Sequence, residues 1–221
     1  MGKIKIIIAD DHSVLRAGLR LLLNNEPDFT VVGEAADGEE VLTLLETITA
    51  DVLVLDLSMP GMGGLECMKE IASRGFSIKL LVLTMYDEEQ YIKEAMKAGA
   101  LGYVAKNAVD TELFVALRTV AKGQRYLSKE NAELLLTSLL TDRSRQEEND
   151  PYVILSVRER EVLKLLVRGF SLSQIAEQLY LSVKTVDTYK TRLMEKLHCS
   201  EKSQLVEYAL HYGLLPVGKK M

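Results

Sequence analysis

Two hydrophobic periods alternate along residues 1–125. Short runs of β-branched and other apolar residues predict buried strands over 4–9, 29–35, 51–56, 78–84 and 101–106. Between these runs the apolar residues recur every three or four positions, as in HSVLRAGLRLLLNN and EEVLTLLETI, which predicts amphipathic helices. Alternating strands and helices of this kind favour an α/β fold, here a five-stranded parallel sheet with helices on both faces.

The pattern changes to purely helical after residue 127. Residues 128–140 predict one helix, and the polar, charged run TDRSRQEENDPYV predicts a flexible linker. Four further helices follow, in SVREREVLKLLVRG, SLSQIAEQL, SVKTVDTYKTRLMEKL and SEKSQLVEYALHYG. We therefore expect a first domain over 1–125, a linker helix and flexible linker over 126–153, an all-α four-helix domain over 154–214 and a tail over 215–221.

Helix boundaries carry their own signals. A residue that can cap a helix is followed three positions later by Glu or Gln at Asp37/Glu40, Asp87/Gln90, Ser156/Glu159 and Ser171/Gln174. Gly99 and Gly123 stand where two of the predicted helices stop.

Composition narrows the class of protein. The 48 % of hydrophobic residues is ample for packed cores, and the two cysteines, Cys67 and Cys199, lack the spacing of a zinc site or disulfide framework. No signal peptide or membrane span is apparent, so we expect a cytoplasmic protein without membrane contact. Residues 156–221 contain 11 Lys and Arg against 7 Asp and Glu, a net charge of +4, whereas the whole chain carries −5. That difference hints at a polyanionic partner for the C-terminal part.

A set of polar residues stands at the carboxyl ends of the predicted strands. Asp10 and Asp11 follow the first strand, Asp56 ends the third, Thr84 ends the fourth and Lys106 ends the fifth. Ligands bind at this edge of a parallel sheet, and clustered carboxylates suit Mg²⁺ or Mn²⁺. A cation, a lysine and a hydroxyl around a central carboxylate can hold a phosphoryl group on it. Any one of these residues alone is explained by a strand-end cap, but the whole set favours the functional interpretation.

The turn after Asp56 adds to this prediction. Residues 57–64, LSMPGMGG, break the apolar strand with one proline and three glycines. We expect this turn to leave Asp56 accessible and to direct the backbone carbonyl of Ser58 toward the metal.

The motifs ADDH (9–12), LDLSMPGMGG (55–64), LTMY (83–86) and GYVAK (102–106) together resemble the receiver domain of response regulators. The whole chain is similar to the NarL/FixJ family, which implies a flavodoxin-like doubly wound sheet. The resemblance implies that Asp56 is the phosphoacceptor, Asp11 a direct metal ligand and Asp10 a holder of metal-bound water. It also implies a backbone ligand from Ser58, phosphoryl contacts from Thr84 and Lys106, and a rotating aromatic switch at Tyr103. The alternative for Tyr103 is an ordinary half-buried aromatic on an edge strand.

The C-terminal helices predict a helix-turn-helix. Ile175, Ala176 and Leu179 are followed across YLS (180–182) by Val186 and Leu193, which gives one apolar face over two short helices. Residues 156–209 also resemble the LuxR-type DNA-binding domain. The resemblance implies DNA contacts from the polar face of the second helix, at Lys184, Thr185, Thr188, Lys190, Thr191 and Arg192. Asp187 departs from relatives that carry lysine, and its role stays open.

Together these features predict a transcription factor that a sensor histidine kinase phosphorylates on Asp56. The partners expected are the kinase, double-stranded promoter DNA, a second copy of the chain and RNA polymerase. The apolar residues of the last helix, Leu205, Val206, Tyr208 and Ala209, are a candidate dimer face. The protein is not expected to be an enzyme beyond self-phosphorylation from a donor and its own dephosphorylation. Two alternatives are a phosphorylation-independent DNA-binding protein with a degenerate receiver, and an aspartyl-phosphate phosphatase, which usually needs a carboxylate where Ser58 stands.

Overall fold

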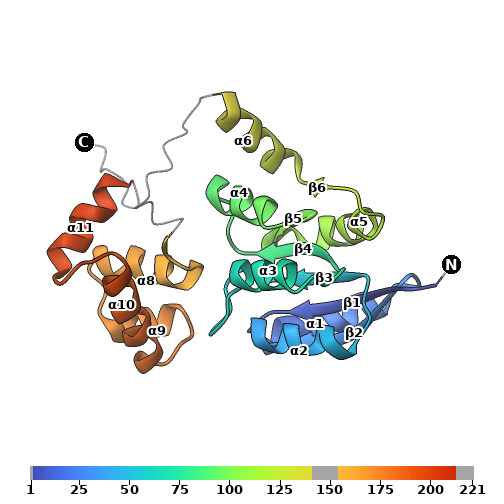
Figure 1. The fold of residues 1–221 in the computed structure, drawn as a ribbon, viewed down its shortest axis with the longest axis horizontal. Coiled ribbons are helices and arrows are strands. Elements are labelled where there is room, and N and C mark those ends of the chain that lie inside the picture. The colour runs from blue at the N-terminus through green and yellow to red at the C-terminus, as the bar shows by residue number, and fades with distance from the viewer. Residues whose placement is uncertain (1, 141–153, 213–221) are drawn as a thin grey trace. The chain divides into compact units, whose positions relative to one another are not determined.

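The computed structural model describes residues 2–140 and 154–212. The chain forms two compact units that divide between residues 143 and 144; Figure 1 draws the first in blue to olive and the second in orange to red. The flexible linker expected over 141–153, the last two residues of the expected domain 154–214, and the tail 215–221 lie outside the described residues. Each unit is described by itself below.

The first unit contains one parallel sheet. Its strands are β1 (Ile4–Ala9), β2 (Phe29–Ala35), β3 (Val52–Leu55), β4 (Lys79–Thr84), β5 (Gly102–Ala105) and β6 (Tyr126–Leu127). Their order is β2-β1-β3-β4-β5-β6, so the doubly wound parallel sheet is confirmed with a sixth strand beyond the five expected. The sixth strand was missed because it has only two residues, Tyr126 and Leu127, which pair with Gly102 and Tyr103.

Helices connect the strands of the first unit. They are α1 (Ser13–Asn24), α2 (Gly38–Thr47), α3 (Gly64–Ser73), α4 (Glu89–Lys97), α5 (Val109–Ala121) and α6 (Lys129–Leu140), with a short 3₁₀ helix, η1 (Lys106–Ala108), before α5. One core cluster joins Ile6 and Ile8 of β1 to Leu19 of α1 and Leu117 of α5. Because neighbouring strand residues point to opposite faces, Ile7 packs on the other side, where it is also fully buried. Helix α6 lies against α4, within the first unit.

The helix ends test the predicted caps. The Asp37 side chain accepts a hydrogen bond of 2.9 Å from the Glu40 backbone N–H and caps α2, as predicted. The prediction at Asp87 is wrong, because α4 begins at Glu89 and its capping position is Glu88, which makes no side-chain cap bond. Gly123 ends α5 with φ +77°, a left-handed backbone conformation that favours glycine.

The turn between β3 and α3 depends on two glycines. Gly61 has φ +61°, which L side chains rarely adopt. At Gly64 an added Cβ would lie 2.2 Å from the Asp56 carbonyl oxygen and 2.8 Å from the Leu57 Cα. Helix α3 therefore starts directly against the backbone of Asp56, and only a residue without a side chain allows this approach.

The second unit contains the four predicted helices, α8 (Val157–Val167), α9 (Leu172–Gln178), α10 (Val183–Lys196) and α11 (Lys202–His211). Capping boxes begin α8 at Ser156 and α9 at Ser171. The Lys196 ammonium of α10 lies 2.7 Å from the buried carboxylate of Glu159 in α8 and ties these helices together. The apolar face of α11 is mostly used inside the unit, since Leu205 is 1 % and Ala209 0 % exposed. The expectation that these two residues lie on a dimer face is therefore wrong, whereas the other two residues of that candidate face, Val206 and Tyr208, are partly exposed.

Candidate functional site

Strand register brings the acidic residues of the first unit together. Ile8 and Ala9 of β1 pair with Val54 and Leu55 of β3, so the next residues, Asp10 and Asp56, leave the sheet side by side. The Asp56 backbone N–H donates to the Ala9 carbonyl at 2.9 Å and extends this pairing by one residue. The prediction that Asp10 and Asp56 meet at one edge of the sheet is confirmed.

The Lys106 side chain joins the two carboxylates. Its Nζ lies 2.7 Å from Asp10 Oδ2 and 2.8 Å from Asp56 Oδ2. Asp56 is 2 % exposed, so the expectation that the turn leaves this carboxylate accessible is wrong for the described conformation. One physical reason is that the turn folds back over the strand end, where Met59 is 1 % and Ser58 7 % exposed. The other is that the Lys106 side chain fills the space between Asp10 and Asp56; we call the site formed by Asp10, Asp11, Asp56, Thr84 and Lys106 the cup.

Burial and charge shift the titration of this cluster. Burial raises the pKa of Asp56 to about 6; the Lys106 ammonium opposes the rise and the neighbouring Asp10 adds to it. For Lys106, burial disfavours the charged form, but attraction to Asp56 and Asp10 outweighs burial and raises its pKa. The surroundings therefore favour the charged form of Lys106 and disfavour the ionised form of Asp56, each compared with the same group in water.

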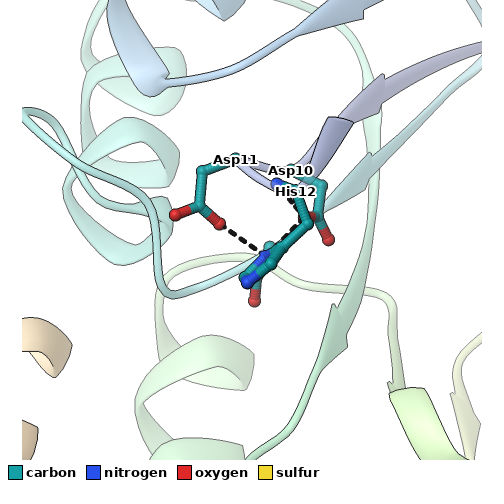
Figure 2. A group of neighbouring side chains, drawn as sticks. Asp10, Asp11 and His12 are labelled. Atoms are coloured by element: carbon teal, nitrogen blue, oxygen red, sulfur yellow. Dashed lines mark hydrogen bonds and ion pairs between the residues drawn. The ribbon is translucent and has the colours of Figure 1, made fainter. Parts of the chain in front are cut away.

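A cation site is built from the same residues. Asp10, Asp11, His12 and Asp56 each offer a ligand atom, and these atoms all lie within 4.8 Å of one another. Asp56 Oδ1 is buried and has no hydrogen-bond partner among the described residues. Figure 2 shows the Asp11 carboxylate and the His12 ring turned toward one another beside Asp10. Clustered oxygen donors with one unsatisfied buried carboxylate oxygen fit a divalent metal ion such as Mg²⁺.

Two further predicted residues border the cup. Thr84 ends β4, is fully buried, and its Oγ1 has no hydrogen-bond partner in the part of the chain that the structure describes. Tyr103 is also fully buried, and its hydroxyl donates to the Tyr86 carbonyl at 2.8 Å. Tyr103 is thus not the half-buried edge residue of the alternative interpretation. Burial also raises the pKa of its phenol.

Sequence reasoning did not assign two side chains that the structure adds to the site. His12 lies in the ADDH motif, and its place directly after two acids was the available signal. Tyr86 is the last residue of the LTMY motif, and its hydroxyl donates to Ser58 Oγ at 3.2 Å in the turn after β3. The periodicity of apolar residues does not predict the contact between Tyr86 and Ser58, because the contact depends on how two loops lie relative to one another.

The second unit offers a separate polar surface on α10. Helix α9 ends at Gln178 and α10 begins at Val183, with Ser182 as its cap, which confirms two helices joined by a tight turn. Val186 and Leu193 face the core. Among the predicted DNA contacts, Lys184, Thr188, Thr191 and Arg192 are exposed, whereas Thr185 and Lys190 are partly buried.

The exposed positions have a helical spacing. Lys184, Thr188 and Thr191 are separated by four and three residues and so share one face of α10. The Thr188 hydroxyl donates to the Lys184 carbonyl at 2.9 Å, and the Thr191 hydroxyl donates to the Asp187 carbonyl at 3.0 Å. Asp187 is exposed on the same helix. The face is therefore polar and mixed in charge.

No helix among the described residues has the length and apolar character needed to span a membrane.

Comparisons with known proteins identify the domain family of each unit. Residues 6–118 match the response regulator receiver domain, and residues 153–209 match the bacterial regulatory proteins of the luxR family. The oxygen regulatory protein NreC of Staphylococcus aureus is 44 % identical over 96 % of this chain and 99 % of its own.

Solved structures give the same picture. The response regulator RcsB of Salmonella enterica serovar Typhimurium has a TM-score of 0.60 and 30 % identity, covering 94 % of this chain and 98 % of its own. The response regulator ChrA of a heme-sensing two-component system has a TM-score of 0.51 and 35 % identity, covering 97 % and 100 %. Such a chain is a regulator and not a classical enzyme. The protein therefore belongs to the NarL/FixJ family of two-component response regulators, in which a receiver domain is joined to a LuxR-type DNA-binding domain.

Proposed function

We propose that Asp56 accepts a phosphoryl group from a phosphohistidine of a partner sensor kinase. The observation that carries the proposal is the Lys106 ammonium, which lies 2.7 Å from an Asp10 oxygen and 2.8 Å from an Asp56 oxygen. Beside it, Asp56 Oδ1 has no hydrogen-bond partner among the residues that the structure describes. In the transfer the phosphorus–nitrogen bond of the donor breaks and a phosphorus–oxygen bond to Asp56 forms. The imidazole nitrogen leaves with the electron pair of the broken bond and then takes up a proton.

The remaining residues of the cup have roles that follow from their chemistry. Lys106 offsets the negative charge that Asp56 gains with the phosphoryl group. Asp10, Asp11, Asp56 and the Ser58 backbone carbonyl would hold Mg²⁺ or Mn²⁺, which neutralises charge on the transferring oxygens when bound. The Thr84 hydroxyl, buried without a partner among the described residues, is available to donate to a phosphoryl oxygen.

Thr84 and Tyr103 form the proposed switch. A hydroxyl drawn toward the phosphoryl group leaves space that a neighbouring aromatic ring can occupy. Tyr103 is already buried in the described conformation, held by its hydrogen bond to the Tyr86 carbonyl. We infer that phosphorylation stabilises this buried rotamer and does not create it.

The output of the switch is DNA binding by α10. RcsB, which resembles this chain, is bound to a promoter in the presence of a phosphomimetic in one structure and binds DNA as dimers in another. We propose that Lys184 and Thr185 contact phosphates and that Thr188, Lys190, Thr191 and Arg192 face the major groove. Phosphorylation would favour a cytoplasmic homodimer on promoter DNA, with RNA polymerase as the downstream partner. Leu205 and Ala209 are buried in their own unit, so only Val206 and Tyr208 of the candidate dimer face on α11 are partly exposed.

Intact-mass measurement tests the phosphorylation. Wild type, Asp56→Asn and Asp11→Asn are incubated with acetyl phosphate and Mg²⁺. We expect one phosphoryl group on the wild type, none on Asp56→Asn, less on Asp11→Asn, and no gain in EDTA. An equal gain on Asp56→Asn would overturn the assignment of the phosphoacceptor.

A second measurement separates this function from that of a degenerate receiver. Sedimentation velocity and promoter binding are followed with and without phosphodonor for the wild type and Asp56→Asn. A phosphodonor-dependent rise in mass and in DNA affinity, absent in the variant, supports the switch. Identical behaviour of the two proteins would favour the phosphorylation-independent regulator.

A further inference from the structure

His12 lies among the acidic residues of the receiver cup. Its Nδ1 is 2.8 Å from Asp11 Oδ1 and 3.1 Å from Asp10 Oδ1. The His12 backbone N–H also donates to Asp10 Oδ1 at 2.8 Å, which holds the His12 backbone next to the Asp10 carboxylate. The His12 side chain is 46 % exposed, whereas those of Asp10 and Asp11 are 3 % and 16 % exposed, so the ring stands at the mouth of the cup.

Imidazole changes the chemistry of a carboxylate site. Mg²⁺ takes oxygen ligands and keeps several waters, so a histidine nitrogen adds little to its binding. Zn²⁺ and related transition metals accept nitrogen ligands readily and bind mixed nitrogen–oxygen sites more tightly than Mg²⁺ does. We propose that His12 is a nitrogen ligand that lets the receiver cup of this protein bind Zn²⁺-class cations, while Mg²⁺ binds through the oxygens alone.

Two observations besides the acidic cluster point to a cation at this place. Asp56 Oδ1 is buried and has no hydrogen-bond partner among the described residues, although Asp56 supplies one of the four converging ligand atoms. The ring nitrogen of His12 faces two carboxylates at hydrogen-bond distance, as Figure 2 shows, so it occupies a position that attracts positive charge.

The inference rests on the proposed receiver metal site and deepens it. For the metal, the proposed function requires only that Mg²⁺ binds through oxygens, those of Asp10, Asp11, Asp56 and the Ser58 backbone. The further inference requires that removal of one imidazole changes the affinity for Zn²⁺ and leaves the affinity for Mg²⁺ unchanged. The two claims therefore fail in different measurements.

Isothermal titration of the full-length protein with MgCl₂ and with ZnCl₂ tests the selectivity. The chain has three histidines, so His198→Asn serves as a matched control that removes an imidazole from the other unit. We expect His12→Asn to weaken Zn²⁺ binding by at least about tenfold and Mg²⁺ binding by less than about twofold. His198→Asn should leave the dissociation constant of the receiver site unchanged for both cations, and Asp11→Asn should weaken both.

Nitrogen-detected NMR of ¹⁵N-histidine-labelled protein gives a direct readout. The His12 resonance is identified by its absence from His12→Asn. Zn²⁺ should move one His12 ring nitrogen to the shift of a coordinated imidazole, and saturating Mg²⁺ should not. An unchanged Zn²⁺ affinity in His12→Asn, or equal losses for both cations, would overturn the inference. Absence of Mg²⁺ binding to the wild type would instead contradict the proposed function.

Discussion

The Tyr86 hydroxyl donates a hydrogen bond of 3.2 Å to Ser58 Oγ and joins the segment after β4 to the turn after β3. The same residue accepts the Tyr103 hydroxyl on its backbone carbonyl at 2.8 Å. Its ring also lies against Tyr91 of α4, with centroids 4.5 Å apart. One residue therefore contacts the turn that follows Asp56, the proposed aromatic switch and the helix beside them.

Removing the Tyr86 hydroxyl tests whether this contact restricts water at the phosphoryl group. The bond to Ser58 must open for the turn to move, and such a bond is worth about 1 kcal/mol. We expect Tyr86→Phe to speed loss of the phosphoryl group about fivefold, measured by the decay of phosphorylated protein after donor removal. Ser58→Ala should have a similar effect, and the double variant should add little. An unchanged or slower decay in both single variants would contradict this role.

The stability of the receiver should depend on pH through Asp56. Burial, with Asp10 beside it, raises the pKa of this carboxyl from 3.8 to about 6 against the opposing pull of Lys106. The folded state thus binds the proton more tightly than the unfolded state, so stability is lost as pH rises from about 4 to above 6. We expect Asp56→Asn to raise the free energy of unfolding by about 2–3 kcal/mol near pH 7.5 and to lose most of this gain near pH 4.

Urea unfolding in EDTA, followed by circular dichroism at both pH values, measures this difference. Asp87→Asn is the control, because Asp87 is exposed and also loses one negative charge. It should change the unfolding free energy by less than about 0.5 kcal/mol at either pH. A gain for Asp56→Asn that is equal at both pH values would mean that its cause is not the ionised carboxylate.

Gly64 and Gly18 make a matched pair of glycine-to-alanine substitutions. A Cβ at Gly64 would collide with the Asp56 carbonyl oxygen at 2.2 Å, whereas a Cβ at Gly18 in α1 has no atom within 4 Å. We expect Gly64→Ala to destabilise the receiver by about 3 kcal/mol or more and to reduce phosphorylation. Gly18→Ala should stabilise it by about 1 kcal/mol, since alanine is the better helix former. Thermal unfolding and acetyl phosphate labelling measure both, and equal effects would show that the close approach at Gly64 is not required.

Charge on α10 should control DNA affinity. Lys184 and Asp187 are both exposed near the start of this helix. If Lys184 contacts a phosphate, Lys184→Ala should weaken binding to all sequences and reduce the salt slope by about 1. Asp187→Lys should tighten binding and steepen the slope by a similar amount. Glu207→Lys, with the same change of charge at an exposed position on α11, is the control and should have a smaller effect on both quantities.

The periodicity of apolar residues was sufficient for most of the fold. Runs such as IKIIIA and VLVL are buried strands because the parallel sheet is covered on both faces. Periodicity failed where an element is very short, as in Tyr126–Leu127. The capping signal failed at Asp87, because α4 begins one residue later than expected and its capping residue, Glu88, makes no side-chain cap bond. The expectation for Leu205 and Ala209 of α11 failed for another reason, because an apolar stripe does not reveal whether it packs within its own unit.

The site was predictable as far as strand ends determine it. Register places Asp10 beside Asp56, and both follow directly from the order of the strands. The burial of the Asp56 carboxylate was not predictable, since it depends on how the Lys106 side chain lies between Asp10 and Asp56. The contact from Tyr86 to Ser58 is likewise a meeting of two loops 28 residues apart.

The burial of Tyr103 bears on the basal activity of this regulator in the absence of a signal. An equilibrium between two conformations responds to a ligand only by a change in population, and the favoured conformation exists before the ligand binds. If Tyr103 is the switch residue proposed above, its full burial in the described structure implies that the unmodified protein already has a finite share of the signalling conformation. Basal transcription from its promoters would then reflect that share, and the kinase would act by amplifying an output that is never zero.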